Sequence, residues 1–141
     1  MSRQYLPLLF NADVKLLIRA CETKAANMGV NFNIAVVDAG GHLLGFSHMD
    51  GATLGSIEVS QRKAVTAALF KAESGAFGDV VRARPLTGIE NFNGGLALFK
   101  GGVPIELEGH VVGGLGIAGG TAVQDLEVAE WALAEFYKTI D

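Results

Sequence analysis

The chain has 141 residues, of which 50% are hydrophobic and only 18% are charged, and its formal net charge is -4. This length suits one domain, residues 1–141, and the low charge excludes an intrinsically disordered chain. The basic residues are scattered, which excludes a nucleic-acid partner, and no segment holds the roughly 18 apolar residues of a membrane span. We therefore expect a cytoplasmic protein, and the excess of apolar residues favours a homo-oligomer, from dimer to octamer.

The first elements in the chain are a helix and a strand pair. Asn11 or Asp13 can cap a helix that ends at Gly29. The spacing of its apolar residues places Cys21 on the buried face, so we interpret this single cysteine as a structural thiol. Two strands follow, joined by an Asp- and Gly-rich turn at residues 38–41.

A second helix is predicted over residues 57–71, with Asp50 or Thr53 as its cap. Its interior is rich in alanine, and small side chains let a helix lie close against its neighbour. Lys63 directly precedes the alanine-rich run. We expect its stem to lie along packed surface while its ammonium stays free.

The middle segment, residues 72–95, has no clear periodicity but is too apolar for disorder. We interpret it as an ordered flap with a short helix near Gly78–Ala83. Three strands are then predicted over 96–100, 103–107 and 110–117.

The chain closes with a final helix that begins after Thr121, which forms a capping box with Gln124. The order of elements is therefore αββαβββα, in which the middle segment, residues 72–95, is left out. Hairpins dominate this order and no βαβ unit repeats. The sequence thus predicts an α+β fold, a three-layer α/β/α sandwich around a five-stranded antiparallel sheet.

The segment from Gly101 to Gly120 is unusually rich in glycine, holding eight of the nineteen glycines of the chain. A phosphate-binding loop is a poor interpretation, because no Lys-Ser/Thr pair follows and acidic residues begin the next helix. Within the last strand, Gly114 and Gly116 leave one face of the strand without side chains. We interpret this face as a packing surface for the alanine-rich helix.

Four blocks of the sequence, "IAVVDAGGHLLGFSHMDGA", "KAVTAALF", "FKGGVPIELEGHVVGGLGIAGG" and "QDLEVAEWAL", resemble the GlcG/HbpS family. That family also includes the C-terminal domain of PduO-type corrinoid adenosyltransferases. The resemblance implies a profilin-like fold and a symmetric oligomer, often octameric. Some relatives bind or degrade haem, so it also implies a small-molecule ligand, with haem as the possible cofactor.

Under this resemblance, the positions that match the family pattern near the expected ligand form one group. They are Met49, Asp50, Lys63, Thr66, Gly101, Gly102 and Pro104, with His48 where the family commonly has arginine.

His48 has two interpretations. It can be the axial ligand of haem iron, with Met49 beside it and Lys63 near a propionate. It can equally be a partly buried strand histidine that is hydrogen-bonded to the backbone. The sequence leaves both open.

Whether the protein is an enzyme also stays open, and no catalytic residue is assigned. An alternative to haem binding is an accessory enzyme or a structural partner in the metabolism of small hydroxyacids, diols or glycerol. In the enzyme version, Lys63 and Asp50 would bind or polarise the substrate.

Overall fold

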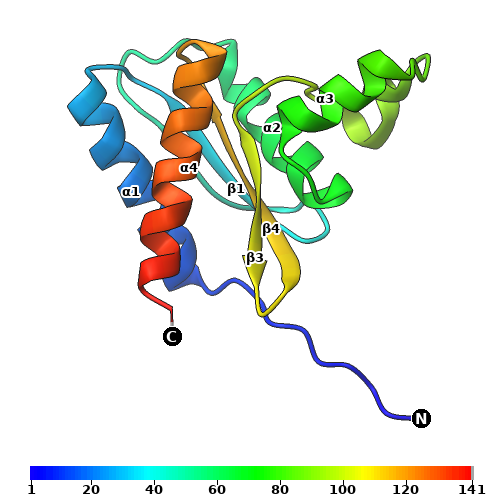
Figure 1. The fold of residues 1–141 in the computed structure, drawn as a ribbon. Helices are drawn as coiled ribbons and strands as arrows, with labels where there is room; N and C mark the ends of the chain where they lie inside the picture. Colours follow the sequence, from blue (N-terminus) through cyan, green and yellow to red (C-terminus); the bar gives the residue numbers. More distant parts are fainter. Residues whose placement is uncertain (141) are drawn as a thin grey trace.

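In the computed structural model, which describes residues 1–140, four helices and a 3-10 helix surround one antiparallel sheet (Figure 1). The sheet has the strand order β2-β1-β4-β3. In chain order the elements are α1 (Asn11–Met28), β1 (Asn33–Asp38), β2 (Leu43–His48), α2 (Ser56–Phe70), α3 (Ser74–Ala83), η1 (Ile89–Gly94), β3 (Gly102–Leu107), β4 (His110–Ala118) and α4 (Ala122–Lys138).

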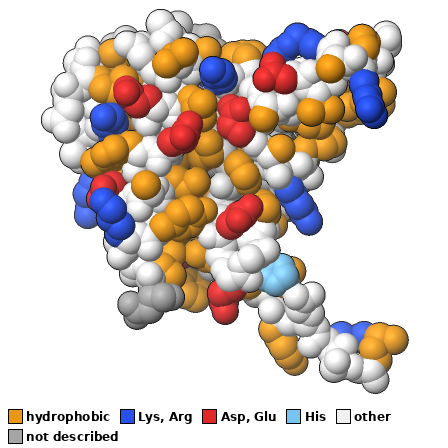
Figure 2. All heavy atoms as spheres, viewed as in Figure 1, with side chains coloured by type: hydrophobic (Ala, Val, Ile, Leu, Met, Phe, Trp, Pro, Cys, Tyr) orange, Lys and Arg blue, Asp and Glu red, His pale blue; other side chains and the backbone are white. Residues whose placement is uncertain are grey.

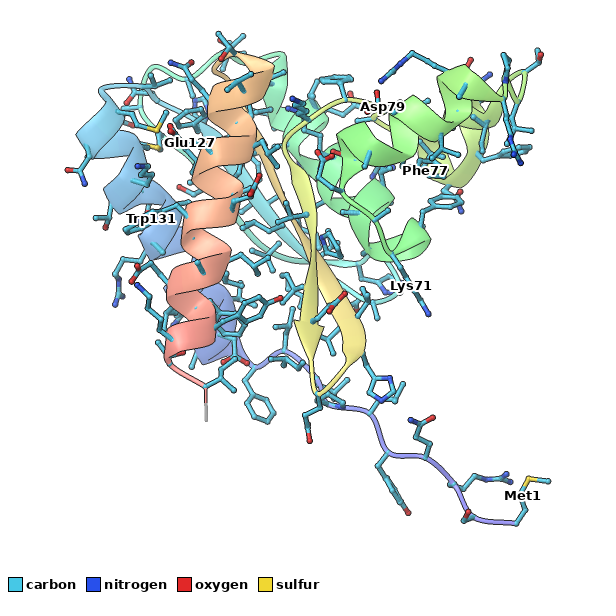
Figure 3. The ribbon with its side chains drawn as sticks, viewed as in Figure 1. Met1, Lys71, Phe77, Asp79, Glu127 and Trp131 are labelled. Atoms are coloured by element: carbon cyan, nitrogen blue, oxygen red, sulfur yellow. The ribbon has the colours of Figure 1, made fainter. Side chains whose placement is uncertain are left out.

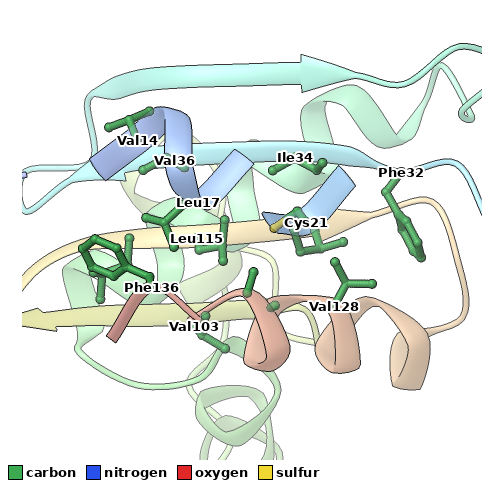
Figure 4. Packing of buried hydrophobic residues seen from close by; sticks show 14 of the residues in the cluster. Val14, Leu17, Cys21, Phe32, Ile34, Val36, Val103, Leu115, Val128 and Phe136 are labelled. Carbon is green, nitrogen blue, oxygen red and sulfur yellow. The ribbon is translucent and has the colours of Figure 1, made fainter. Parts of the chain in front are cut away.

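The sheet lies between two helical layers, as the sequence predicts. Helices α1 and α4 cover one face, and α2 covers the other (Figure 1). Alternation along β1 divides its side chains between the two layers: Ile34 and Val36 enter the α1/α4 core, while Ala35 and Val37 meet α2. Figure 4 shows the larger core, in which Cys21 is fully buried as expected.

Helix α2 lies directly against the backbone of β4, and two glycines permit this contact. A Cβ on Gly114 would overlap the carbonyl oxygen of Ala64, and one on Gly116 would overlap that of Ser60. The expectation that Gly114 and Gly116 form a packing surface for the alanine-rich helix is therefore confirmed.

The sheet has four strands, so the five-stranded prediction is wrong. The segment 96–100, predicted as the additional strand, has its backbone bonded elsewhere. Ala97 N donates to Thr66 Oγ1 at 3.0 Å, and Phe99 O accepts from Ser74 Oγ at 2.6 Å. Side chains of α2 and α3 thus form hydrogen bonds with backbone groups of this segment that a strand would use to pair with its neighbour. In addition, the neighbouring edge strand carries Pro104, which has no N–H to offer.

The start of α2 also differs from the expectation. Neither Asp50 nor Thr53 caps the helix, which begins after Gly55 without a side-chain cap. The preceding residues instead form a tight turn, in which Ser56 N bonds to Thr53 O. This turn places the helix start later than the polar residues suggest.

The short helix expected near Gly78–Ala83 is present, and it forms the second half of the longer helix α3. Its start is fixed by Glu73, whose carboxylate accepts the backbone N–H groups of Gly75 and Ala76. The middle segment is therefore ordered in its first half by an ordinary capped helix.

The predicted cap of α1 is wrong, because Phe10 is the N-cap and Asn11 and Asp13 lie within the helix, where Asp13 accepts the Phe10 N–H. Three other local signals agree with the structure. The capping box of Thr121 and Gln124 is present at α4, and Gly29 ends α1 with a φ of 69°. Asp38 Oδ1 accepts two backbone N–H groups within the predicted turn and so closes it. No helix within residues 1–140 is long and apolar enough to cross a membrane.

The α2–β4 contact predicts a sharp difference between two glycine substitutions. Gly116→Ala inserts a methyl group against the Ser60 carbonyl, so we expect it to lower the free energy of unfolding by about 3 kcal/mol. Gly55→Ala is the matched control, because nothing lies within 4 Å of the added Cβ and its φ is -61°. Urea denaturation followed by circular dichroism measures both. Equal stability of the two variants would contradict the close contact.

Candidate functional site

The expected ligand-binding residues lie in two places on the fold. His48, Met49 and Asp50 form the end of the edge strand β2 and the turn after it. The second group lies where α2 contacts β3 and β4, and it comprises Lys63, Thr66, Gly101, Gly102 and Pro104. Among residues 1–140, no hydrogen bond or ion pair of these side chains links the two groups.

His48 is exposed, and its ring is held by an asparagine side chain across the sheet. His48 Nδ1 lies 2.6 Å from Asn33 Oδ1. The amide of Asn33 is itself oriented, because its Nδ2 donates to Thr53 O at 2.9 Å. Asn33 Oδ1 is therefore an acceptor, so Nδ1 of His48 carries the proton. In the neutral ring, the lone pair is then on the exposed Nε2.

The sequence analysis missed Asn33 as part of this arrangement. It is fully buried at the start of β1, on the α2 face of the sheet, and it pairs directly with His48 in the register of the two strands. A buried asparagine opposite a strand histidine is the signal that could have identified it.

Met49 and Asp50 differ in how free their side chains are. The Met49 sulfur accepts from the backbone N–H of Phe32 at 3.4 Å, and the side chain packs against the larger core. Asp50 is exposed in the turn that follows β2. Of the adjacent pair His48 and Met49, the histidine is thus the one that presents a donor atom to solvent.

Lys63 is buried, with 1% of its surface exposed, so the expectation of a free ammonium is wrong. Its Nζ donates to Asp125 Oδ2 at 2.8 Å and to Ile117 O at 2.9 Å, and it lies 5.0 Å from the centre of the Phe99 ring. Burial lowers the pKa of Lys63, while the hydrogen bond and charge of Asp125 oppose that shift. The lysine joins α2 to the first turn of α4.

The two glycines of the second group support this contact. Gly101 has a φ of 127°, and a Cβ there would lie 2.7 Å from Lys63 Nζ. Gly102 N donates to Ser74 Oγ at 2.9 Å, and a Cβ on Gly102 would overlap the carbonyl oxygen of Lys63. Both positions therefore exclude a side chain so that the lysine and its helix can lie against the sheet.

Thr66 and Pro104 also have structural partners. Thr66 is fully buried, and its hydroxyl donates to Arg62 O at 2.8 Å while it accepts the Ala97 N–H. Pro104 lies within β3 and pairs with Gly114 of β4. The residues of the second group thus hold the elements together, and their polar groups are already bonded.

The remaining cysteine and histidine side chains do not form a reactive centre. Burial raises the pKa of the Cys21 thiol far above its ordinary value, which disfavours the thiolate. His42 Nδ1 lies 3.1 Å from Asp38 in an exposed turn, and His110 Nε2 lies 3.1 Å from Gln4 Nε2. Within residues 1–140, no group of three or more His, Cys, Asp or Glu residues could hold a metal ion.

The helices also leave a shallow groove on the outer side of α4. It has a volume of about 540 Å³, and Figure 3 shows two of its residues, Glu127 and Trp131, on the outward side of the helix. Lys24 Nζ lies 5.8 Å from the centre of the Trp131 ring, which places the cation over the aromatic face. His48 is not among the residues that line this groove.

The architecture and the oriented strand histidine define a class: a three-layer α+β protein with a histidine donor at the edge of its sheet. Residues 9–134 match the family described as "Haem degrading protein HbpS-like", and the chain belongs to this family. The resemblance seen in the sequence is thereby confirmed.

Individual relatives agree with this assignment. The chain is 36% identical over 124 residues to the uncharacterized 15.0 kDa protein of the dhaT-dhaS intergenic region of Citrobacter freundii, and the match covers 86% of this chain and 87% of that one. The crystal structure of a PduOC:heme complex is similar with a TM-score of 0.85 and 34% identity, covering 91% of this chain and 94% of that one. The crystal structure of a double mutant of HbpS from Streptomyces reticuli has a TM-score of 0.86 and 27% identity, covering 94% and 90%.

The buried ion pair predicts that removing one partner costs more than removing both charges. Lys63→Met leaves the Asp125 carboxylate buried with Gly120 N as its remaining partner, so we expect a loss of about 3–5 kcal/mol in the free energy of unfolding. The double variant Lys63→Met/Asp125→Asn should regain a large part of it, because the amide keeps an acceptor for Gly120 N. Urea denaturation measures both.

Lys138→Met is the control for this prediction, because Lys138 forms an exposed pair with Glu135 and its loss should cost less than about 1 kcal/mol. If Lys63→Met is no more destabilising than Lys138→Met, the buried pair does not support the fold as described.

Proposed function

We propose that this chain is a small-molecule-binding homo-oligomer whose ligand is haem or another tetrapyrrole, bound at His48. The observation that carries the proposal is the hydrogen-bonded series from Thr53 O through the Asn33 amide to His48 Nδ1. An outer partner on one imidazole nitrogen is the usual way in which proteins orient a histidine and leave its other nitrogen for a metal. His48 Nε2 is the nitrogen so presented.

The chemistry of this donor fits haem iron, which accepts a neutral imidazole as an axial ligand. Met49 is the weaker candidate, because its sulfur already accepts from Phe32 N. The second group of residues, around Lys63, acts on the ligand indirectly under this proposal, by fixing the adjoining contact between α2 and the sheet. A relative, PduOC, crystallised as a heme complex, which supports the choice of ligand.

The exposure of His48 supports a binding site at a boundary between subunits. A tetrapyrrole is flat and has two apolar faces, and a histidine on the open edge of a sheet covers only one of them. One large apolar side chain in the segment before α2, Leu54, is 74% exposed. A second copy of the chain would cover the other face, which agrees with the homo-oligomer expected from the composition.

The alternative is an accessory enzyme or structural partner in the metabolism of small hydroxyacids, diols or glycerol. It is kept because a relative is encoded in a dhaT-dhaS intergenic region. The residue pair expected to act on such a substrate is Lys63 with Asp50, and the Lys63 ammonium is enclosed by Asp125 and Ile117 O. The geometry therefore favours haem binding over this version of catalysis.

The proposal predicts that haem binding depends on one of the three histidines. We expect the protein to shift the Soret band of added haem, and His48→Ala to weaken binding at least tenfold because the axial donor is lost. His42→Ala and His110→Ala are matched controls that should bind like the unchanged chain. Met49→Leu should leave the Soret position unchanged, since its sulfur is already bonded. Absorbance titration of each variant provides the measurement.

Two outcomes would contradict different parts of the proposal. Absence of a Soret shift with the unchanged chain would contradict haem binding itself. A shift that His48→Ala leaves unaltered would contradict the site but not the ligand. A thermal-shift series with small hydroxyacids, diols and aldehydes tests the alternative, since stabilisation by one of these with no effect of haem would favour it.

A further inference from the structure

The first ten residues leave the body of the protein as an extended arm. Figures 1 and 3 show this segment projecting beyond the β3–β4 hairpin, with Met1 at its far end. It carries a row of large exposed side chains. Their exposed fractions are 91% for Tyr5, 57% for Leu6, 73% for Leu8 and 70% for Phe10. Contiguous exposed apolar side chains of this kind mark an interaction surface.

The arm has an inward and an outward face, as a strand does. Pro7 and Leu9 are partly buried, and Leu9 packs against the larger core. Leu6, Leu8 and Phe10 alternate with them and face outward. Among the described residues, positions 1–9 form no backbone–backbone hydrogen bond. The arm is therefore held to the body through Leu9 and through the 3.1 Å contact of Gln4 with His110, while its outer side chains stay largely exposed.

A groove of about 680 Å³ lies at the base of the same arm. Its walls come from the arm, the start of α1, the β3–β4 turn and the C-terminal end of the chain. The lining residues are Pro7, Leu8, Phe10, Asp13, Leu107, Glu108 and Ile140. The groove is thus mainly apolar, with two carboxylates at its margin. Figure 2 shows apolar side chains on the arm beyond the acidic end of the hairpin.

The arm and the groove have complementary charges. Arg3 is the one charged side chain among residues 1–10, while Asp13 and Glu108 make the groove acidic. The tip of the arm does not enter its own groove in this structure, since it extends away from the body (Figure 1). The same apolar segment on another copy of the chain has both the side chains and the charge to enter it.

We propose that residues 3–6 are a docking arm that binds the groove between the β3–β4 turn and the end of α4 on a second copy of this chain. Tyr5 and Leu6 supply the apolar contact, and Arg3 meets Glu108 of the second copy. One arm and one groove on each copy allow a reciprocal exchange around a two-fold axis, which closes the assembly. This inference rests on the homo-oligomeric part of the proposed function and is independent of the ligand.

The oligomeric mass of the full chain in solution, measured by light scattering after gel filtration, tests the docking arm. We expect Tyr5→Asp/Leu6→Asp to reduce the mass at least twofold, with an unchanged circular dichroism spectrum. Val123→Asp is the matched control, because Val123 is 68% exposed at the start of α4, at the other end of the helix from the groove. It should leave the mass unchanged.

A charge exchange tests the direction of docking. Arg3→Glu and Glu108→Arg should each weaken self-association at least tenfold, and the double variant should restore it, because the pair is re-formed with reversed signs. Failure of the double variant to recover would overturn the assigned pairing.

The outcomes also separate this inference from the proposal on which it rests. If the unchanged chain is monomeric, the docking arm and the homo-oligomer are both overturned. If the unchanged chain assembles and Tyr5→Asp/Leu6→Asp assembles equally, the docking arm is overturned while the homo-oligomer stands.

Discussion

The structure depends on the direct contact between the backbone of α2 and that of β4. Side chains normally hold packed layers about 10 Å apart, but here the Ser60 and Ala64 carbonyls occupy the space of absent side chains on Gly116 and Gly114. The glycines weaken the strand intrinsically. That cost is offset because the small residues of α2 then bury a continuous surface against the sheet. The contact also fixes the rotation of α2.

The position of Lys63 follows from that rotation. With the alanine face of α2 on β4, the side chain of Lys63 reaches Ile117 O near the end of β4 and Asp125 in the first turn of α4. Gly101 and Gly102 leave room for it there. One ion pair therefore joins the two helical layers around the sheet. It also encloses the Lys63 ammonium, which therefore carries no free charge at the surface.

Much of this arrangement could be predicted from the sequence, because its causes are local. The capping box at Thr121, the turn at Asp38 and the bare strand face at Gly114 each follow from short-range geometry. The failures involve partners that are distant in the chain. Residues 96–100 have the composition of a strand, but side chains of α2 and α3 take their backbone groups. The same reason applies to the candidate site: Asn33 becomes informative only when the register of β1 and β2 places it opposite His48.

The N-terminal arm and the exposed His48 lie near opposite ends of β2. A second groove, on the other side of the arm, is lined by Leu6 and by Leu44 near the start of this strand, whereas His48 ends the strand. An extended strand rises about 3.3 Å per residue, so the two features are separated by more than a direct contact can span. Asn33, the hydrogen-bond partner of the His48 ring, is not part of the arm, so a change in the arm leaves this contact in place. If the proposed haem site is covered by the second copy that the arm holds, loss of docking lowers haem affinity without altering the axial donor. If another subunit covers it, haem affinity and docking vary independently.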